Sequence, residues 1–252
     1  MKDLKAWSRI CDRLYVWDYA ANYWHTFGIF PDFGVIQRDI QIFAENGVKG
    51  VYTEGNYYMR YCDTEFGELR AFLISKCLQD PYCDYGGLMD EFCGAYYGEG
   101  GRYIVRFIDT VTRFTKLNHV SVGTGISWSM FMDPATAAYC DTLWERAKAC
   151  ATEEQLERIK RSEISWRYWK ADAGMLEFAG IFHGRNARIR LHDDIIATGA
   201  TKAAESAGLT FAEDYMYIPV RYWFGVSLNA LDDFLLKVRR FIIRIAPDFL
   251  KE

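Results

Sequence analysis

RLYVWDYAANY (residues 13–23) and GVKGVYTEGNY (residues 47–57) are the two stretches that decide the fold of this chain. Each contains a short run of aromatic, β-branched and other apolar residues, at positions 14–17 in the first stretch and 48–52 in the second. Runs of this length and composition are typical of buried parallel strands. The two stretches therefore predict two neighbouring strands of one sheet.

The segment between these strands has the pattern of an amphipathic helix. It opens on Pro-Asp at position 31 and closes on Asn-Gly at position 46, which are start and stop signals of helices. Between them the apolar residues Ile36, Ile40 and Phe43 share one helical face. Strand, helix and strand in this order predict a right-handed βαβ unit.

A carboxylate follows each predicted strand. Asp18 comes directly after the first run, and Glu54 comes two residues after the second. The carboxyl ends of neighbouring parallel strands meet at one edge, where α/β sheets and barrels gather their ligands. We therefore expect Asp18 and Glu54 to lie in a pocket at this edge.

Composition limits the kinds of partner. The chain has 252 residues, of which 50% are hydrophobic, so it can bury the core of one large domain or two small ones. The net charge is −4 and the Lys and Arg residues form no long block, so we expect no nucleic-acid partner. No apolar run of transmembrane length is present, so we expect no membrane partner either.

The cysteines and histidines predict neither a disulfide framework nor a metal site. The seven Cys are odd in number, scattered and without a CxxC pair, which is typical of free thiols in a reducing compartment. With no secretory leader in the sequence, we expect a cytoplasmic protein or a chain whose upstream leader is missing. No two of the four His stand at i and i+4, so we expect no metal ligands.

The remainder of the chain predicts mainly helices. A Ser-, Gly- and Asn-rich loop at residues 117–134 marks a boundary between two domains, residues 1–116 and residues 135–252. A third apolar segment, residues 215–223, is read as a strand or an extended arm. Helical periodicity predicts helices at residues 2–12, 66–78, 88–97, 101–114, 135–150, 152–178, 185–207 and 229–245.

Aromatic residues are unusually frequent, with 17 Tyr, 17 Phe and 8 Trp. Most of these rings are expected in the core, but rings that follow a strand end can also stack on the C–H faces of a sugar. Asn and Tyr side chains at the same strand ends could bond sugar hydroxyls, although both are also ordinary loop residues. The candidate substrate-binding residues are Trp17, Tyr19, Asn22, Tyr23, Asn56 and Tyr57.

Five segments together carry a resemblance to a known family. They are WSRICDRLYVWDYAANY (7–23), GVKGVYTEGNY (47–57), GELRAFLISKCLQDPYCD (67–84), LMDEFCGAYYG (88–98) and LWERAKACATEEQLERIKRSEISWRYW (143–169). Over roughly residues 3–175 they resemble the C-terminal half of a bacterial family of unknown function, placed among the TIM-barrel glycoside hydrolases. That family is similar to α-glucuronidases and includes endo-β-N-acetylglucosaminidases.

The resemblance implies an α/β fold that is mostly helical: the C-terminal portion of a (β/α)₈ TIM barrel followed by an α-helical module. It also implies hydrolysis of glycosidic bonds in complex glycans, at N-acetylglucosamine, without a cofactor. Two carboxyls about 5 to 5.5 Å apart serve retaining glycosidases, and adjacent strands are about 4.8 Å apart. Asp18 and Glu54 are therefore the candidate catalytic pair; the alternatives are that Asp18 caps a loop and Glu54 pairs with an Arg.

The early barrel strands of that family have no counterpart in this sequence, which leaves open whether the chain is itself an enzyme. We expect a fragment or a truncated gene product. Two other functions fit the same residues. One is a carbohydrate-binding remnant that keeps the aromatic edge, and the other is a helical module that pairs through an open barrel edge with a second copy or with a missing N-terminal half.

Overall fold

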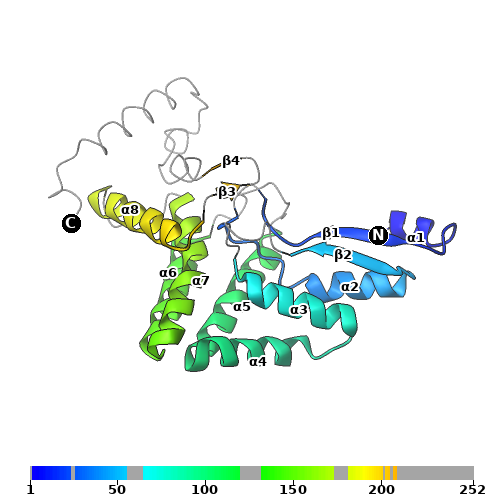
Figure 1. The fold of residues 1–252 in the computed structure, drawn as a ribbon, viewed down its shortest axis with the longest axis horizontal. Coiled ribbons are helices and arrows are strands. Elements are labelled where there is room, and N and C mark those ends of the chain that lie inside the picture. Colours follow the sequence, from blue (N-terminus) through cyan, green and yellow to red (C-terminus); the bar gives the residue numbers. More distant parts are fainter. Residues whose placement is uncertain are drawn as a thin grey trace, which may run out of the picture.

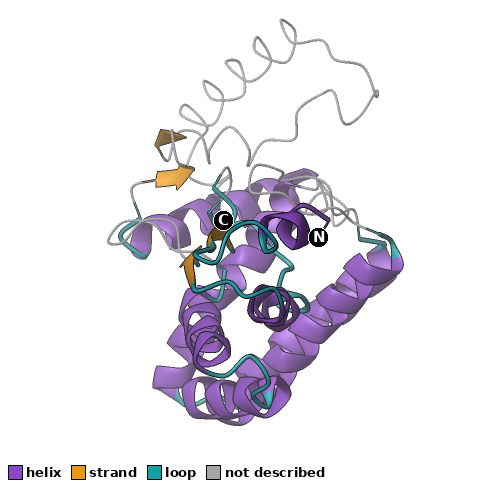
Figure 2. Ribbon diagram, turned by 90° about the vertical axis from the view of Figure 1, so that its right-hand side faces the viewer, coloured by secondary structure: helices purple, strands orange, loops and turns teal. Residues whose placement is uncertain are grey.

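The structure, a computed structural model, describes residues 2–23, 26–55, 65–119, 132–172, 181–200, 202–204 and 207–208. These residues form a mostly helical α/β structure (Figures 1 and 2). In chain order the elements are α1 (Lys2–Trp7), β1 (Tyr15–Tyr19), α2 (Ile36–Glu45), β2 (Gly50–Glu54), α3 (Gly67–Gln79), α4 (Tyr85–Tyr97), the 3₁₀ turn η1 (Gly98–Gly100), α5 (Gly101–Leu117), α6 (Pro134–Ala149), α7 (Glu153–Asp172), α8 (Ile181–Ala197), β3 (Lys202–Ala204) and β4 (Ala207–Gly208).

The predicted βαβ unit is confirmed. Strands β1 and β2 are parallel, with a register that runs from Tyr15 opposite Gly50 to Tyr19 opposite Glu54. Helix α2 lies along one side of this sheet (Figure 1), and its Ile36 and Ile40 are buried. Within the described part of the chain these two strands are the whole parallel sheet, and they form no barrel.

Several helix ends differ from the expected positions. Helix α2 starts at Ile36 rather than at Pro31, because the backbone first makes a turn in which the amides of Val35 and Ile36 donate to the carbonyl of Asp32. Helix α4 starts three residues earlier than expected, at Tyr85. The Asp84 carboxylate caps it by accepting from the amide of Gly87 at 3.0 Å.

The predicted helix at residues 185–207 is wrong in its second half. Helix α8 ends at Ala197, and the strands β3 and β4 follow it as a short antiparallel pair. Gly199 lies between α8 and β3 with φ of +81°, a left-handed conformation that ends helices and that glycine adopts without strain. The elements expected at residues 215–223 and 229–245 lie outside the described residues.

The core consists mainly of helix faces that bury large aromatic rings. Trp144 of α6 stacks on Phe66 with centroids 6.1 Å apart, and lies 5.0 Å from the ring of Phe107 in α5. Buried residues of α2 to α7 belong to one hydrophobic cluster, so helices on both sides of residues 117–134 contribute to it. The division into domains at residues 1–116 and 135–252 stays a prediction.

None of the described helices combines the length and the apolar composition needed to cross a bilayer.

Candidate functional site

The two predicted catalytic carboxylates lie on opposite faces of the β1–β2 sheet. Side chains alternate along a strand, and residues in register on parallel strands share a face. Asp18 is in register with Thr53, whereas Glu54 is in register with Tyr19. The structure therefore does not bring Asp18 and Glu54 together as a pair. The offset arises because β1 continues one residue beyond Asp18.

The face that carries Glu54 is aromatic and open. We call it the aromatic face. Trp17 and Tyr52 have 64% and 62% of their surface exposed, and their rings meet edge to face with centroids 5.0 Å apart. Exposed apolar rings that lie side by side on one surface are typical of binding sites. The aromatic face consists of Tyr15, Trp17, Tyr19, Tyr52 and Glu54.

Two neutral donors orient the Glu54 carboxylate. The indole Nε1 of Trp17 donates to Oε1 at 2.6 Å, and the hydroxyl of Tyr23 donates to Oε2 at 2.5 Å. The ring of Tyr23 also meets that of Tyr19 edge to face, with centroids 5.6 Å apart. Among the described residues Glu54 has no ion pair, so the alternative in which it pairs with an Arg finds no support there.

The other predicted substrate-binding residues differ in position. Trp17 and Tyr19 are on the aromatic face, as described above. Asn22 and Tyr23 are buried just beyond β1, with exposed fractions of 3% and 7%. Tyr23 therefore donates its hydrogen bond to the Glu54 carboxylate from a buried position. Asn56 and Tyr57 lie outside the described residues.

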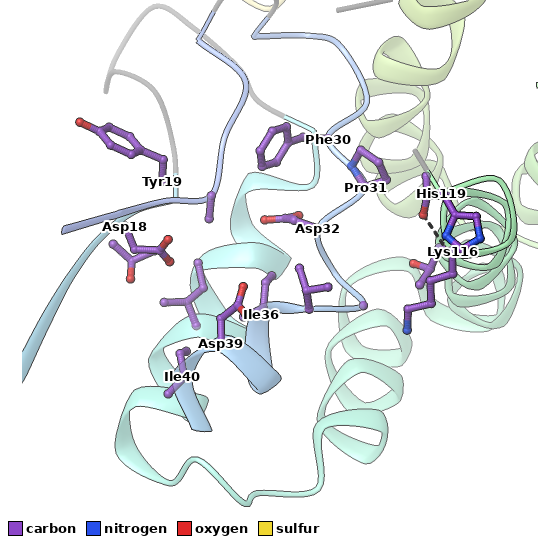
Figure 3. A pocket seen from close by; sticks show the side chains of 17 residues that line it. Asp18, Tyr19, Phe30, Pro31, Asp32, Ile36, Asp39, Ile40, Lys116 and His119 are labelled. Atoms are coloured by element: carbon purple, nitrogen blue, oxygen red, sulfur yellow. Dashed lines mark hydrogen bonds between the residues drawn. The ribbon is translucent and has the colours of Figure 1, made fainter. Parts of the chain in front are cut away.

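The face that carries Asp18 borders a cavity of about 530 Å³ between the sheet and the helices α2, α3 and α5 (Figure 3). We call it the acidic cavity, because three carboxylates line it: Asp18 of β1, Asp32 of the segment before α2, and Asp39 of α2. Asp39 was not among the site residues predicted from the sequence. The signal was present, since Asp39 interrupts the apolar face formed by Ile36 and Ile40 at helical spacing.

Burial raises the pKa of all three carboxyl groups above the usual range. It is the main cause for Asp18, Asp32 and Asp39 alike. The charge of Asp18 raises the pKa of Asp32 and of Asp39 further, whereas the guanidinium of Arg70 opposes the rise at Asp32.

Arg70 of α3 is fully buried and holds the segment before α2 in place. Its Nη2 lies 3.0 Å from Oδ1 of Asp32 and 3.2 Å from Oε2 of Glu65. The same nitrogen donates to the carbonyl of Phe30 at 3.0 Å. Burial raises the pKa of Glu65 to about 7, although Arg70 acts in the opposite direction. These contacts fix the position of Asp32 at the cavity wall.

Among the described residues no three His, Cys, Asp or Glu side chains are grouped so that they could hold a metal ion.

Residues 1–109 match the model of a family described as a domain of unknown function (DUF4838). No curated protein and no solved structure matched the chain. Residues 1–109 are therefore a DUF4838 domain, and they include the aromatic face and the three carboxylates of the acidic cavity. Its placement among the glycoside hydrolases stays a prediction.

Proposed function

We propose that the aromatic face is a carbohydrate-binding surface. The observation that carries the proposal is a set of exposed rings gathered around one oriented carboxylate, with Trp17 and Tyr52 in contact beside Glu54. The C–H groups of a pyranose stack on such rings, and their burial contributes the apolar part of the binding energy. Aromatic rings on a strand are also held rigidly, which lowers the entropic cost of binding.

Glu54 supplies the polar part of the proposed site. Each of its oxygens accepts one hydrogen bond from the protein, from Trp17 or from Tyr23. A carboxylate oxygen has two lone-pair sites, so each oxygen can still accept a bond from a sugar hydroxyl. Because the protein donors hold the carboxylate in one orientation, those bonds would select among sugar epimers.

Glycoside hydrolysis is the second candidate, and it rests on the expected placement of the family among the glycoside hydrolases. Asp18 and Glu54 face opposite sides of the sheet, so their geometry does not favour the two-carboxylate mechanism. Glu54 is the carboxyl that the aromatic face offers to a bound sugar. Hydrolysis on this face would therefore use Glu54 as the acid and the acetamido group of an N-acetylglucosamine substrate as the internal nucleophile.

The test is calorimetric titration with an N-glycan and with an N-acetylglucosamine oligosaccharide. We expect Trp17→Ala and Tyr52→Ala each to weaken binding about tenfold, since one stacked ring is worth about 0.5–1.5 kcal/mol beyond its buried area. Trp7→Ala is the matched control, because Trp7 is similarly exposed, at 57%, but lies on α1. An absence of binding, or an equal loss in Trp7→Ala, would refute the proposal.

Hydrolysis is measured separately on an aryl N-acetylglucosaminide and on the N-glycan. Under the second candidate, Glu54→Gln abolishes turnover while Asp18→Asn retains it. Binding without turnover in the parent protein would assign the aromatic face to binding alone. A dimer on a sizing column that Trp17→Ala converts to a monomer would instead assign the face to pairing between chains.

A further inference from the structure

We propose that the acidic cavity is a second binding site, specific for a primary ammonium group on a short apolar chain, such as that of a small diamine. The cavity lies on the face of the sheet opposite to the aromatic face. The proposal therefore does not depend on carbohydrate binding.

The shape of the cavity fits a small ligand. Its volume of about 530 Å³ lies within the range of roughly 300 to 1,000 Å³ that is typical of small-molecule sites. Figure 3 shows the side chains of Asp18, Asp32 and Asp39 directed into the same space from three different segments. A ligand at this point would meet acceptors from more than one side.

Two buried oxygen atoms at this site have no hydrogen-bond partner among the described residues. Asp32 is only 8% exposed; its Oδ1 pairs with Arg70, but its Oδ2 has no hydrogen-bond partner among the described residues. The hydroxyl oxygen of Thr53, which lies beside Asp18 in the sheet, is also buried and also lacks a hydrogen-bond partner among the described residues. Buried polar atoms in folded proteins are nearly always paired. Both oxygens accept hydrogen bonds, and an ammonium group has three donors.

The charge around the cavity also favours a cation. The pKa values of its three carboxyl groups are raised chiefly by burial. Lys116 of α5 and His119, which follows α5, line the far side, away from the three carboxylates (Figure 3). Lys116 forms no ion pair with a described residue. A bound ammonium group would stabilise the charged forms of these carboxyl groups, which burial disfavours.

The remaining walls distinguish an organic cation from a metal ion. Ile36, Ile40 and Ile74 line the cavity next to the carboxylates, so an alkyl chain would be removed from water there. The described residues, by contrast, group no three carboxylate, Cys or His side chains closely enough for a metal. The walls therefore select an alkylammonium ion.

The test is calorimetric titration of the whole chain with 1,4-diaminobutane, and with 1,4-butanediol as the uncharged ligand of similar length. We expect saturable one-to-one binding of the diamine and none of the diol. Asp18→Asn and Asp39→Asn should each weaken diamine binding about tenfold or more, since each removes one charge-assisted contact. Asp12→Asn is the matched control, because it removes the same charge from an exposed residue outside the cavity.

Three results would overturn the proposal. They are no saturable binding of the diamine, an equal loss of affinity in Asp12→Asn, and displacement of the diamine by an equal concentration of Mg²⁺ or Ca²⁺. Thermal unfolding of each variant accompanies the titration. Asp18→Asn and Asp39→Asn are expected to unfold at or above the temperature of the parent, because each removes a partly buried charge that burial disfavours.

Discussion

Replacement of Arg70 by Met should destabilise the protein strongly. Arg70 is 0% exposed, and its guanidinium is the cation that both Asp32 and Glu65 contact. Met keeps much of the aliphatic volume but removes the charge and all the donors. Two buried carboxylates would then share a site without a cation, and the carbonyl of Phe30 would lose a donor.

The magnitude follows from the cost of an uncompensated buried charge. Breaking a buried ion pair by removing one partner costs about 3–5 kcal/mol. For a chain of this size each kcal/mol lowers the melting temperature by roughly 2–4 °C, so we expect a fall of about 10 °C. The loss should be smaller at pH 5 than at pH 8, because the carboxyl groups left behind by Arg70→Met take up protons as the pH falls.

The assay is urea and thermal unfolding followed by circular dichroism at both pH values. Arg38→Met is the control, because Arg38 also forms an ion pair, with Glu45, but has 54% of its side chain exposed. An exposed pair of this kind is worth about 0–1 kcal/mol. If Arg70→Met cost no more than Arg38→Met, the network of Arg70, Asp32 and Glu65 would not hold the segment before α2.

Three further substitutions test individual contacts. Glu65→Gln should flatten the pH dependence of stability: the folded pKa of about 7 lies above the ordinary 4.5, so the contribution of Glu65 to stability is greatest below pH 4.5 and is lost, by roughly 3 kcal/mol, as the pH rises through 7; an unchanged pH profile of the melting temperature would contradict this. Gly101→Ala should cost about 1–3 kcal/mol in urea unfolding, because the new Cβ would clash with the backbone of Cys93, and an unaffected midpoint would show that the junction of α4 and α5 can shift. Asp84→Ala should cost about 1 kcal/mol by the same assay, since it removes the cap of α4, whereas Asp84→Asn should retain most of the stability.

The βαβ unit could be predicted from the sequence because its evidence is local. The short apolar runs at β1 and β2 and the spacing of Ile36 and Ile40 each reflect one element. The true start of α2 could not be predicted in this way. The segment before it is held by Arg70, whose contact with Asp32 joins residues 38 positions apart, and no local pattern reports such a contact.

The candidate site was predicted in composition but not in geometry. The residue types at the strand ends indicated Trp17, Tyr19 and Glu54, and these three residues do share the aromatic face. Which face Asp18 takes depends on strand register, and a difference of one residue moves a side chain to the opposite face. The sequence alone did not determine that register, so it could not show that Asp18 and Glu54 lie on opposite faces of the sheet.

The most direct test of the central proposal is an NMR titration of the tryptophan indole N–H signals with an N-acetylglucosamine oligosaccharide. The chain has 8 Trp, and the signals of Trp17 and Trp7 are assigned by their loss in Trp17→Phe and Trp7→Phe. Carbohydrate binding at the aromatic face predicts that the Trp17 signal shifts in a saturable way, since its Nε1 donates to Glu54 within the site, while the signal of Trp7 stays in place. Saturable binding that leaves the Trp17 signal unmoved would contradict the account.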